Sequence, residues 1–216
     1  MDSVSNQTPA AGMVAHPLRR GENVRTQRFD VTSTMRAGLK GQQSAIIWLT
    51  GLPGAGKSTI ANIVERRLTA EGRHCYILDG DNLRRGINKD LGFSAADRVE
   101  NIRRAAELAK LLADAGLITI VSLISPFARE RAMARTMAGE FHFVEVFIAA
   151  PLEVCEARDP KGLYAKARRG MLPGFTGIDA PYEPPTAAEM VLNTATAEPE
   201  VSAEALIAFL RGCSIL

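Results

Sequence analysis

A glycine-rich run holds the side chains of this sequence that are most capable of chemistry. Its order fits the pattern G-x-x-x-x-G-K-[ST], in which backbone N–H groups surround a polyphosphate, the lysine reaches the β- and γ-phosphates and the hydroxyl contacts magnesium. A helix that starts at the run would add the positive end of its dipole. The run therefore predicts a site for ATP or a related triphosphate, with Lys57 at the phosphates and Ser58 at Mg²⁺. Its residues are Gly51, Leu52, Pro53, Gly54, Ala55, Gly56, Lys57, Ser58 and Thr59.

The elements around this run match the context that the motif requires. Apolar residues 45–49 predict a buried strand before it, and residues 60–68 show helical spacing after it. Strand and helix patterns then alternate, which predicts an α/β fold of the P-loop NTPase type, with a five-stranded parallel sheet inside three α/β/α layers. Ligands of such sheets bind at the carboxyl ends of the strands. Further strands are expected at 73–78, 117–124, 141–149 and 189–192, and further helices at 95–115, 127–138, from Pro151 onward and at 203–210.

Acidic residues follow the second predicted strand. Asp81 is the candidate for orienting or deprotonating an acceptor hydroxyl and for helping to hold magnesium. The alternative is that Asp81 caps a helix starting at Asn82, and both roles are compatible. Asp79 is as compatible with a structural role as with a functional one. The third predicted strand ends without an acid and runs into Ser125.

Arginines and aromatic residues predict a second subsite. Arg84 and Arg98 flank a short glycine-containing segment that carries Phe93, a combination that suits a planar base with a charged tail. The alternatives are a solvated arginine face and a core phenylalanine. Residues 159–185 form a long stretch rich in glycine, proline and basic residues, which predicts a mobile lid that carries Phe175 and closes over the phosphates.

Composition limits the classes that remain. A net charge of +2 argues against a nucleic-acid binder, and no apolar run approaches the length of about 20 residues that a membrane span needs. Three widely spaced cysteines indicate reduced thiols and a cytoplasmic protein. Residues 1–40 are expected to form a flexible tail followed by an arm that packs on the domain or a partner subunit, or stays solvated. A transit peptide is the less favoured interpretation of the tail, and residues 41–216 form the predicted domain.

Several longer strings resemble the adenylylsulfate kinase family over about residues 40–212. This family phosphorylates the 3′-hydroxyl of adenosine 5′-phosphosulfate (APS) with ATP and Mg²⁺ to give PAPS and ADP. One departure is Ala128, which stands where the family usually has arginine. The strings are Asp79-Gly80-Asp81-Asn82-Leu83-Arg84, Leu91-Gly92-Phe93-Ser94, Asp97-Arg98, Glu100-Asn101-Ile102-Arg103-Arg104, Ile124-Ser125-Pro126, Glu156-Ala157-Arg158-Asp159-Pro160-Lys161-Gly162-Leu163-Tyr164, Phe175-Thr176-Gly177-Ile178-Asp179 and Pro181-Tyr182-Glu183.

The resemblance implies roles for these residues. Phe93 and Phe175 would enclose the adenine of APS, and Arg158 would lie beside ATP. Some members of the family form a phosphoserine at the position of Ser125, but direct in-line transfer needs no covalent intermediate, so Ser125 is expected to line the site. The phosphosulfate would be held by Arg84, Arg98, Asn101 and Lys161, with the backbone near Ile124 and Ser125. The implied catalytic residues are Lys57, Asp81 and Ser125.

The resemblance also implies a homodimer in cytosolic sulfate assimilation, and a separate ATP sulfurylase stays open as a further partner. Three other functions stay open at this point. A GTPase switch would need N-K-x-D, and in the nearest string, Asn88-Lys89-Asp90-Leu91, the aspartate comes one residue early. Another small-molecule kinase would share the loop and the lid but not the aromatic and arginine set. A non-catalytic sulfurylase partner would not need Lys57 and Asp81.

Overall fold

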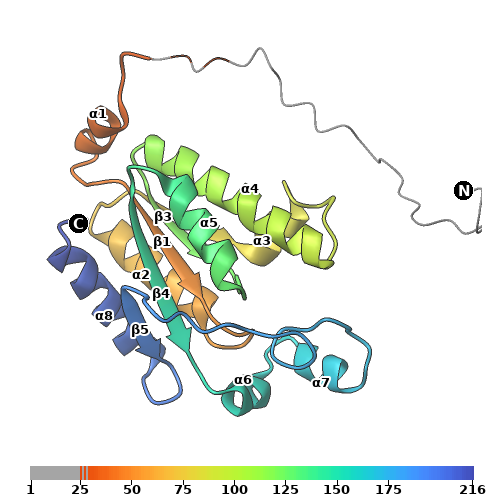
Figure 1. Cartoon of the computed structure of the whole chain (residues 1–216). Helices are drawn as coiled ribbons and strands as arrows, with labels where there is room; N and C mark the ends of the chain where they lie inside the picture. The colour runs from red at the N-terminus through yellow and green to blue at the C-terminus, as the bar shows by residue number, and fades with distance from the viewer. Residues whose placement is uncertain (1–24, 26, 28) are drawn as a thin grey trace, which may run out of the picture. The chain divides into compact units, whose positions relative to one another are not determined.

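The computed structural model describes residues 25, 27 and 29–216 (Figure 1). The chain divides into two compact units, Met1–Asp30 and Val31–Leu216. The described residues of the first unit form no helix or strand, and the predicted tail over residues 1 to about 20 lies outside the described residues. The second unit begins ahead of the predicted boundary at residue 41. Within the described part of the chain, no helix combines the length and apolar character of a membrane span.

A parallel sheet of five strands forms the centre of the second unit, as predicted. The strand order is β2-β3-β1-β4-β5, and every neighbouring pair is parallel. All six residues of the central strand are buried, as expected for a strand that is covered on both faces. The observed bounds agree with the predicted ones to within two residues. They are β1 Ala45–Thr50, β2 Cys75–Asp79, β3 Ile118–Ser122, β4 His142–Ala149 and β5 Met190–Asn193.

Helices cover both faces of this sheet and confirm the three-layer α/β/α architecture (Figure 1). Alternate side chains of β1 point to opposite faces. Ile47 and Leu49 join a core cluster with α2 and α8, whereas Ile46 and Trp48 join a second cluster with α4 and α5. The helices are α1 Ser33–Gly38, α2 Lys57–Ala70, α3 Gly80–Arg85, α4 Ala95–Asp114, α5 Ala128–Ala138, α6 Leu152–Arg158, α7 Leu163–Arg168 and α8 Pro199–Gly212.

Two helix starts position residues of the predicted site. Ser94 caps α4 as expected, and its side chain forms a capping box with Asp97. The cap of α3 is Asp79, whose carboxylate accepts from the N–H groups of Asp81 at 3.0 Å and Asn82 at 3.5 Å. The interpretation of Asp81 as a helix cap is therefore wrong, because the helix begins directly at the end of β2 and Asp79 takes that role.

The predicted lid contains more regular structure than the sequence suggested. Its first part includes helix α7, which the glycine- and proline-rich composition concealed. Asp159 fixes the start of this helix by accepting from the N–H groups of Tyr164 at 3.1 Å and Ala165 at 3.0 Å. The buried Tyr164 hydroxyl donates to the carbonyl of Pro53 at 2.9 Å, so α7 packs directly on the glycine-rich loop.

The opposite edge of the sheet, where the strands begin, is held by polar contacts from α1 and the segment after it. Arg36 forms an ion pair of 2.8 Å with Asp114 at the end of α4. The Gln42 amide donates to carbonyl groups shortly before β2 and β3, both at 2.9 Å. The N–H of Gln43 donates to the carbonyl of Ile215 at 3.3 Å. The first and last parts of the second unit thus meet at this edge.

Candidate active site

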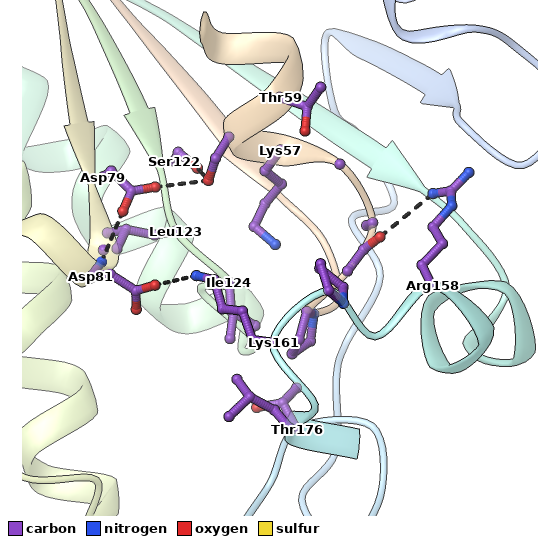
Figure 2. A pocket seen from close by; sticks show the side chains of 18 of the residues that line it. Lys57, Thr59, Asp79, Asp81, Ser122, Leu123, Ile124, Arg158, Lys161 and Thr176 are labelled. Atoms are coloured by element: carbon purple, nitrogen blue, oxygen red, sulfur yellow. Dashed lines mark hydrogen bonds and ion pairs between the residues drawn. The ribbon is translucent and has the colours of Figure 1, made fainter. Parts of the chain in front are cut away.

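A cavity of about 1020 Å³ lies at the carboxyl ends of β1, β2 and β3 (Figure 2). The parallel sheet directs its strand ends to this edge, so residues far apart in the sequence meet there. Gly51 and Leu52 do not line the cavity themselves. Their carbonyl groups accept hydrogen bonds from Lys57, which does. The predicted residues in the lining are Pro53, Gly54, Ala55, Gly56, Lys57, Ser58, Thr59, Asp81, Arg84, Phe93, Arg98, Asn101, Ile124, Ser125, Arg158, Lys161 and Phe175.

The glycine-rich loop joins β1 to α2 and forms one wall of the cavity. Gly51 has a φ of 149°, and a Cβ atom there would lie 2.5 Å from the carbonyl oxygen of Ile148. Gly54 has a φ of 76°, and its Cβ would lie 2.9 Å from the carbonyl oxygen of Cys155. Both positions therefore require glycine, and the tight loop leaves the N–H groups at the start of α2 free to bind phosphate.

Lys57 extends from the first turn of α2 into the cavity (Figure 2). Its ammonium donates to the carbonyl groups of Gly51 at 2.9 Å and Leu52 at 2.8 Å. Burial lowers the pKa of Lys57 from 10.5 to about 8, although the nearby Cys155 and Asp79 favour the charged form. Lys57 is thus a buried cation, and no carboxylate among the described residues forms an ion pair with it. A phosphate group could take the place of that missing partner.

Next to Lys57 in the sequence, Ser58 brings together side-chain oxygen atoms from α2, β2 and β3. The Ser58 hydroxyl donates to the Asp79 carboxylate at 2.7 Å, and it lies 3.1 Å from the Ser122 hydroxyl. Asp79 therefore accepts three hydrogen bonds, two from the backbone of α3 and one from Ser58. The carboxylate that contacts Ser58 belongs to Asp79 and not to Asp81, the other residue predicted to help hold magnesium.

Asp81 lies across the cavity from the phosphate loop, and Lys161 of the predicted lid forms an ion pair with it (Figure 2). Both side chains are largely exposed, at 63% and 62%. An exposed pair contributes little to stability. Its importance here is geometric, because it brings the lid to the carboxylate that the sequence selected for the acceptor hydroxyl.

Arg84 and Phe93 lie together in the part of the cavity that is predicted to hold the acceptor. The guanidinium carbon of Arg84 lies 4.5 Å from the centre of the Phe93 ring, a cation–π contact. Arg84 also donates to the carbonyl of Gly92 at 2.7 Å. The Phe93 side chain is 69% exposed, so it is not part of the core. The arginine orients an accessible aromatic ring toward the cavity.

Arg98 connects α4 to the predicted lid. It donates to the hydroxyl of Thr176 at 3.0 Å and to the carbonyl of Phe93 at 3.0 Å, and it also contacts the carbonyl of Gly174. Asn101 lies one turn further along the helix, where its side-chain oxygen accepts from the buried Asn88 at 3.0 Å. These contacts exclude the solvated arginine face for Arg98 and link the lid to the aromatic subsite.

Phe175 lies on the lid side of the same cavity. Its ring packs edge-on against Tyr164, with centroids 5.0 Å apart and planes at 80°. Asp179 shapes this part of the lid by accepting from the N–H groups of Gly174 and Phe175 at 2.6 and 2.5 Å. The cavity therefore has two aromatic walls, Phe93 and Phe175, from segments far apart in the sequence.

Ser125 contributes to the cavity mainly through its backbone. The residue is only 2% exposed, and its hydroxyl accepts from the indole N–H of Trp48 at 3.1 Å. Two residues later, Phe127 lies beneath the guanidinium of Arg129, which is 5.6 Å from the ring centre. Arg129, the arginine that follows Ala128, therefore packs on Phe127.

The segment that completes the other end of the cavity was not among the residues predicted from the sequence. Residues 194–199 directly follow β5 and line the cavity together with Arg158. The Arg158 guanidinium donates to the Thr194 hydroxyl at 3.4 Å and to the Gly54 carbonyl at 3.5 Å. The Thr194 hydroxyl donates in turn to the Ala55 carbonyl at 2.8 Å. The available signal was the position of Thr194, at the carboxyl end of a predicted strand.

A phosphate loop that shares one cavity with a second subsite of aromatic rings and arginines is characteristic of a P-loop kinase, which brings a nucleotide and an acceptor together. The chain belongs to the adenylylsulphate kinase family, which matches residues 43–193. An adenylyl-sulfate kinase from Shewanella pealeana is 51% identical over 189 residues, which are 88% of this chain and 92% of that protein.

Two further comparisons extend this result. The APS kinase CysC of Mycobacterium tuberculosis, solved in complex with AMPPNP and APS, superposes with a TM-score of 0.77 at 48% identity, covering 79% of this chain and 99% of that one. The bifunctional enzyme NodQ of Rhizobium sp. strain N33 is 56% identical over 95% of this chain but only 32% of its own length. The chain thus spans about a third of the length of the bifunctional relatives that it matches.

Proposed function

We propose that this chain transfers the γ-phosphoryl group of ATP to the 3′-hydroxyl of APS, giving PAPS and ADP in sulfate assimilation. The observation that carries the proposal is the pairing of Phe93 and Phe175 with Arg84 and Arg98 around the cavity that also contains the phosphate loop. Aromatic faces suit an adenine, and arginines suit the anionic phosphosulfate attached to it. The related CysC structure in complex with AMPPNP and APS supports the same assignment.

On the acceptor side, the adenine of APS stacks between Phe93 and Phe175. The phosphosulfate binds Arg84 and Arg98, next to Asn101 and the backbone of Ile124 and Ser125. Arg98 currently uses its donors on Phe93 and on the lid, so a bound anion would compete for them. Lys161 could then be shared between the substrate and Asp81, its present partner.

On the donor side, the phosphates of ATP bind the glycine-rich loop and Lys57. Arg158 and residues 194–199 form the wall nearest the nucleotide base. Mg²⁺ needs few protein ligands when phosphates supply the others, and Ser58, Asp79 and Asp81 offer hard oxygen atoms for it, directly or through water. Bound there, the ion would neutralise charge on the β- and γ-phosphates.

The reaction is an in-line displacement. The 3′-oxygen of APS attacks the γ-phosphorus while the bond from that phosphorus to the bridging oxygen of ADP breaks. Asp81 orients the hydroxyl and accepts its proton, and Lys57 and the loop N–H groups hold the phosphate oxygens. Ser125 forms the wall behind the acceptor without becoming phosphorylated, because its hydroxyl is buried against Trp48.

The remaining proposals concern the setting of the reaction. Three free cysteines support a cytoplasmic location. A homodimer is supported by exposed apolar side chains on and next to α1, such as Met35 at 56% and Leu39 at 88%. An ATP sulfurylase partner would supply the APS, and the bifunctional relatives of greater length are compatible with such a partner.

The first experiment is a coupled ADP-release assay with Mg-ATP in which APS, AMP, adenosine and no acceptor are compared. The nucleotide product is identified by its mass. ADP release that depends on APS, together with PAPS formation, is the expected result. ADP release with another acceptor but not with APS would leave the kinase class intact and refute the assignment of the acceptor subsite. A GTPase switch would instead hydrolyse nucleotide without any acceptor.

A further inference from the structure

The turn after β3 has an unusual backbone for a wall of a binding site. Ser125 has a φ of 38°, which lies in the left-handed region that few non-glycine residues adopt. Serine disfavours this region because its Cβ approaches the backbone. Such conformations persist only when the surroundings enforce them, and they concentrate at functional sites. The groups that enforce this one are therefore candidates for a functional role.

Hydrogen bonds hold the turn on each side of Ser125. The Thr50 hydroxyl donates to the carbonyl of Ile124 at 2.7 Å, and the N–H of Glu183 donates to the carbonyl of Pro126 at 2.8 Å. Thr50 ends the central strand, whereas Glu183 belongs to the end of the predicted lid. The Thr50 hydroxyl also contacts the carbonyl of Ser125, but at 3.4 Å this hydrogen bond is long and leaves room for a stronger donor.

Arg131 supplies that donor. One guanidinium nitrogen donates to the carbonyl of Ser125 at 2.8 Å and another to the carbonyl of Glu183 at 2.8 Å. The third nitrogen, Nε, forms an ion pair of 2.7 Å with Glu145 of β4, and Arg131 is only 3% exposed. A single buried side chain thus ties the turn, the end of the lid and the sheet together.

We propose that Arg131 is a positioning residue for the acceptor subsite, which holds the strained turn Ile124–Pro126 in the form that contacts APS. The inference rests on the proposed function and deepens it, because all three turn residues line the cavity. The planar guanidinium directs two N–H donors at the two carbonyl groups while its charge pairs with Glu145. A lysine ammonium could keep the ion pair but would not reproduce this fork.

Arg135 provides a matched control on the same helix. It also pairs with Glu145, at 3.5 Å, and with Glu189 at 2.8 Å. Its backbone contact is the carbonyl of Phe143 at 3.3 Å, in β4 rather than in the turn. Removal of Arg135 therefore perturbs the same ionic cluster without touching Ser125, so it separates a general loss of charge pairing from a specific loss of positioning.

The test compares wild-type chain, Arg131→Lys, the double variant Arg131→Met with Glu145→Met, and Arg135→Met. The double variant removes both buried charges and so avoids the large cost of leaving one unpaired. Thermal unfolding first establishes that each variant folds. Steady-state kinetics then give KM for APS, KM for ATP and kcat. Emission from Trp48, the single tryptophan of the chain and the donor to Ser125, reports on the turn in Arg131→Lys. Trp48 also stacks on Phe143, which contacts Arg135, so its emission is not used to judge Arg135→Met.

The expected result is a rise of about tenfold in KM for APS in Arg131→Lys and in the double variant, the size associated with one lost charge-assisted hydrogen bond. KM for ATP should stay unchanged, Trp48 emission should shift in Arg131→Lys, and Arg135→Met should keep its KM for APS. A folded Arg131 variant with the native KM for APS would overturn the inference alone, and so would an equal rise in Arg135→Met. An inactive but folded wild-type chain would overturn the proposed function itself.

Discussion

Nucleotide binding should be coupled to protonation of Lys57. Its ammonium is buried against two loop carbonyl groups, and burial lowers its pKa to about 8. The phosphates of ATP would place several negative charges beside it and raise that pKa again. Binding above neutral pH must therefore take up a proton, and ATP affinity should fall as the pH rises beyond 8.

The size of the effect follows from the difference between 10.5 and about 8, which corresponds to a cost of about 3 kcal/mol for the charged form. Because the folded pKa is the lower one, the unfolded chain binds more protons between these values. The buried ammonium of Lys57 therefore lowers the free energy of unfolding below pH 8, and this loss of stability shrinks as the pH rises toward 10.5. Phosphate binding removes the same penalty by stabilising the ammonium.

Calorimetric titration with Mg-AMPPNP, which avoids turnover, measures this coupling. Parallel titrations in two buffers of different ionisation enthalpy give the number of protons taken up. We expect almost none at pH 7, about half a proton at pH 8 and most of one proton at pH 9. In Lys57→Arg the guanidinium stays charged, so uptake should disappear even where binding is retained. Binding by the wild-type chain without proton uptake up to pH 9 would refute the reasoning.

Two other predictions concern the acceptor side. Asp81→Asn should lower kcat at least about 100-fold, since it removes the base, while ATP affinity stays constant. Lys161→Met, which breaks the same ion pair but keeps the carboxylate, is its control, and an equal loss of kcat there would assign the effect to the pair. Phe175→Ala should raise KM for APS about tenfold, by loss of stacking, and leave KM for ATP unchanged. Equal increases for both substrates would mean that the phenylalanine only supports the lid.

Local patterns predicted the parts of the fold in which local and tertiary preferences agree. The central strand Ala45–Thr50 is apolar throughout, and the start of α4 carries its own capping box at Ser94 and Asp97. Helix α1 was missed because its six residues have no apolar periodicity, and Arg36 docks it by hydrogen bonds to the carboxylate and carbonyl of Asp114, which lies 78 residues away. Tertiary contacts of this kind leave no local signal.

The same distinction applies to the site. The phosphate loop is contiguous, so the sequence alone identified its residues and their spacing. The sequence also selected Arg98 and Phe175 but could not show that Arg98 donates to Thr176 in the lid. Asp79 received no definite role, since nothing local indicates that its carboxylate would meet Ser58 after α2 and β2 fold. Thr194 was missed because a lone threonine after a strand has no distinctive pattern.

The contact between Gln43 and Ile215 has a consequence for how this domain can be combined with others. The polypeptide enters the second unit and leaves it at the edge where the strands begin, whereas the cavity lies where they end. Domains whose two ends lie close together are readily joined to other sequences. A neighbouring domain could therefore be added or exchanged in evolution without reshaping the opening through which substrates enter. The bifunctional relatives, in which the matching segment makes up about a third of the length, are consistent with this modular use.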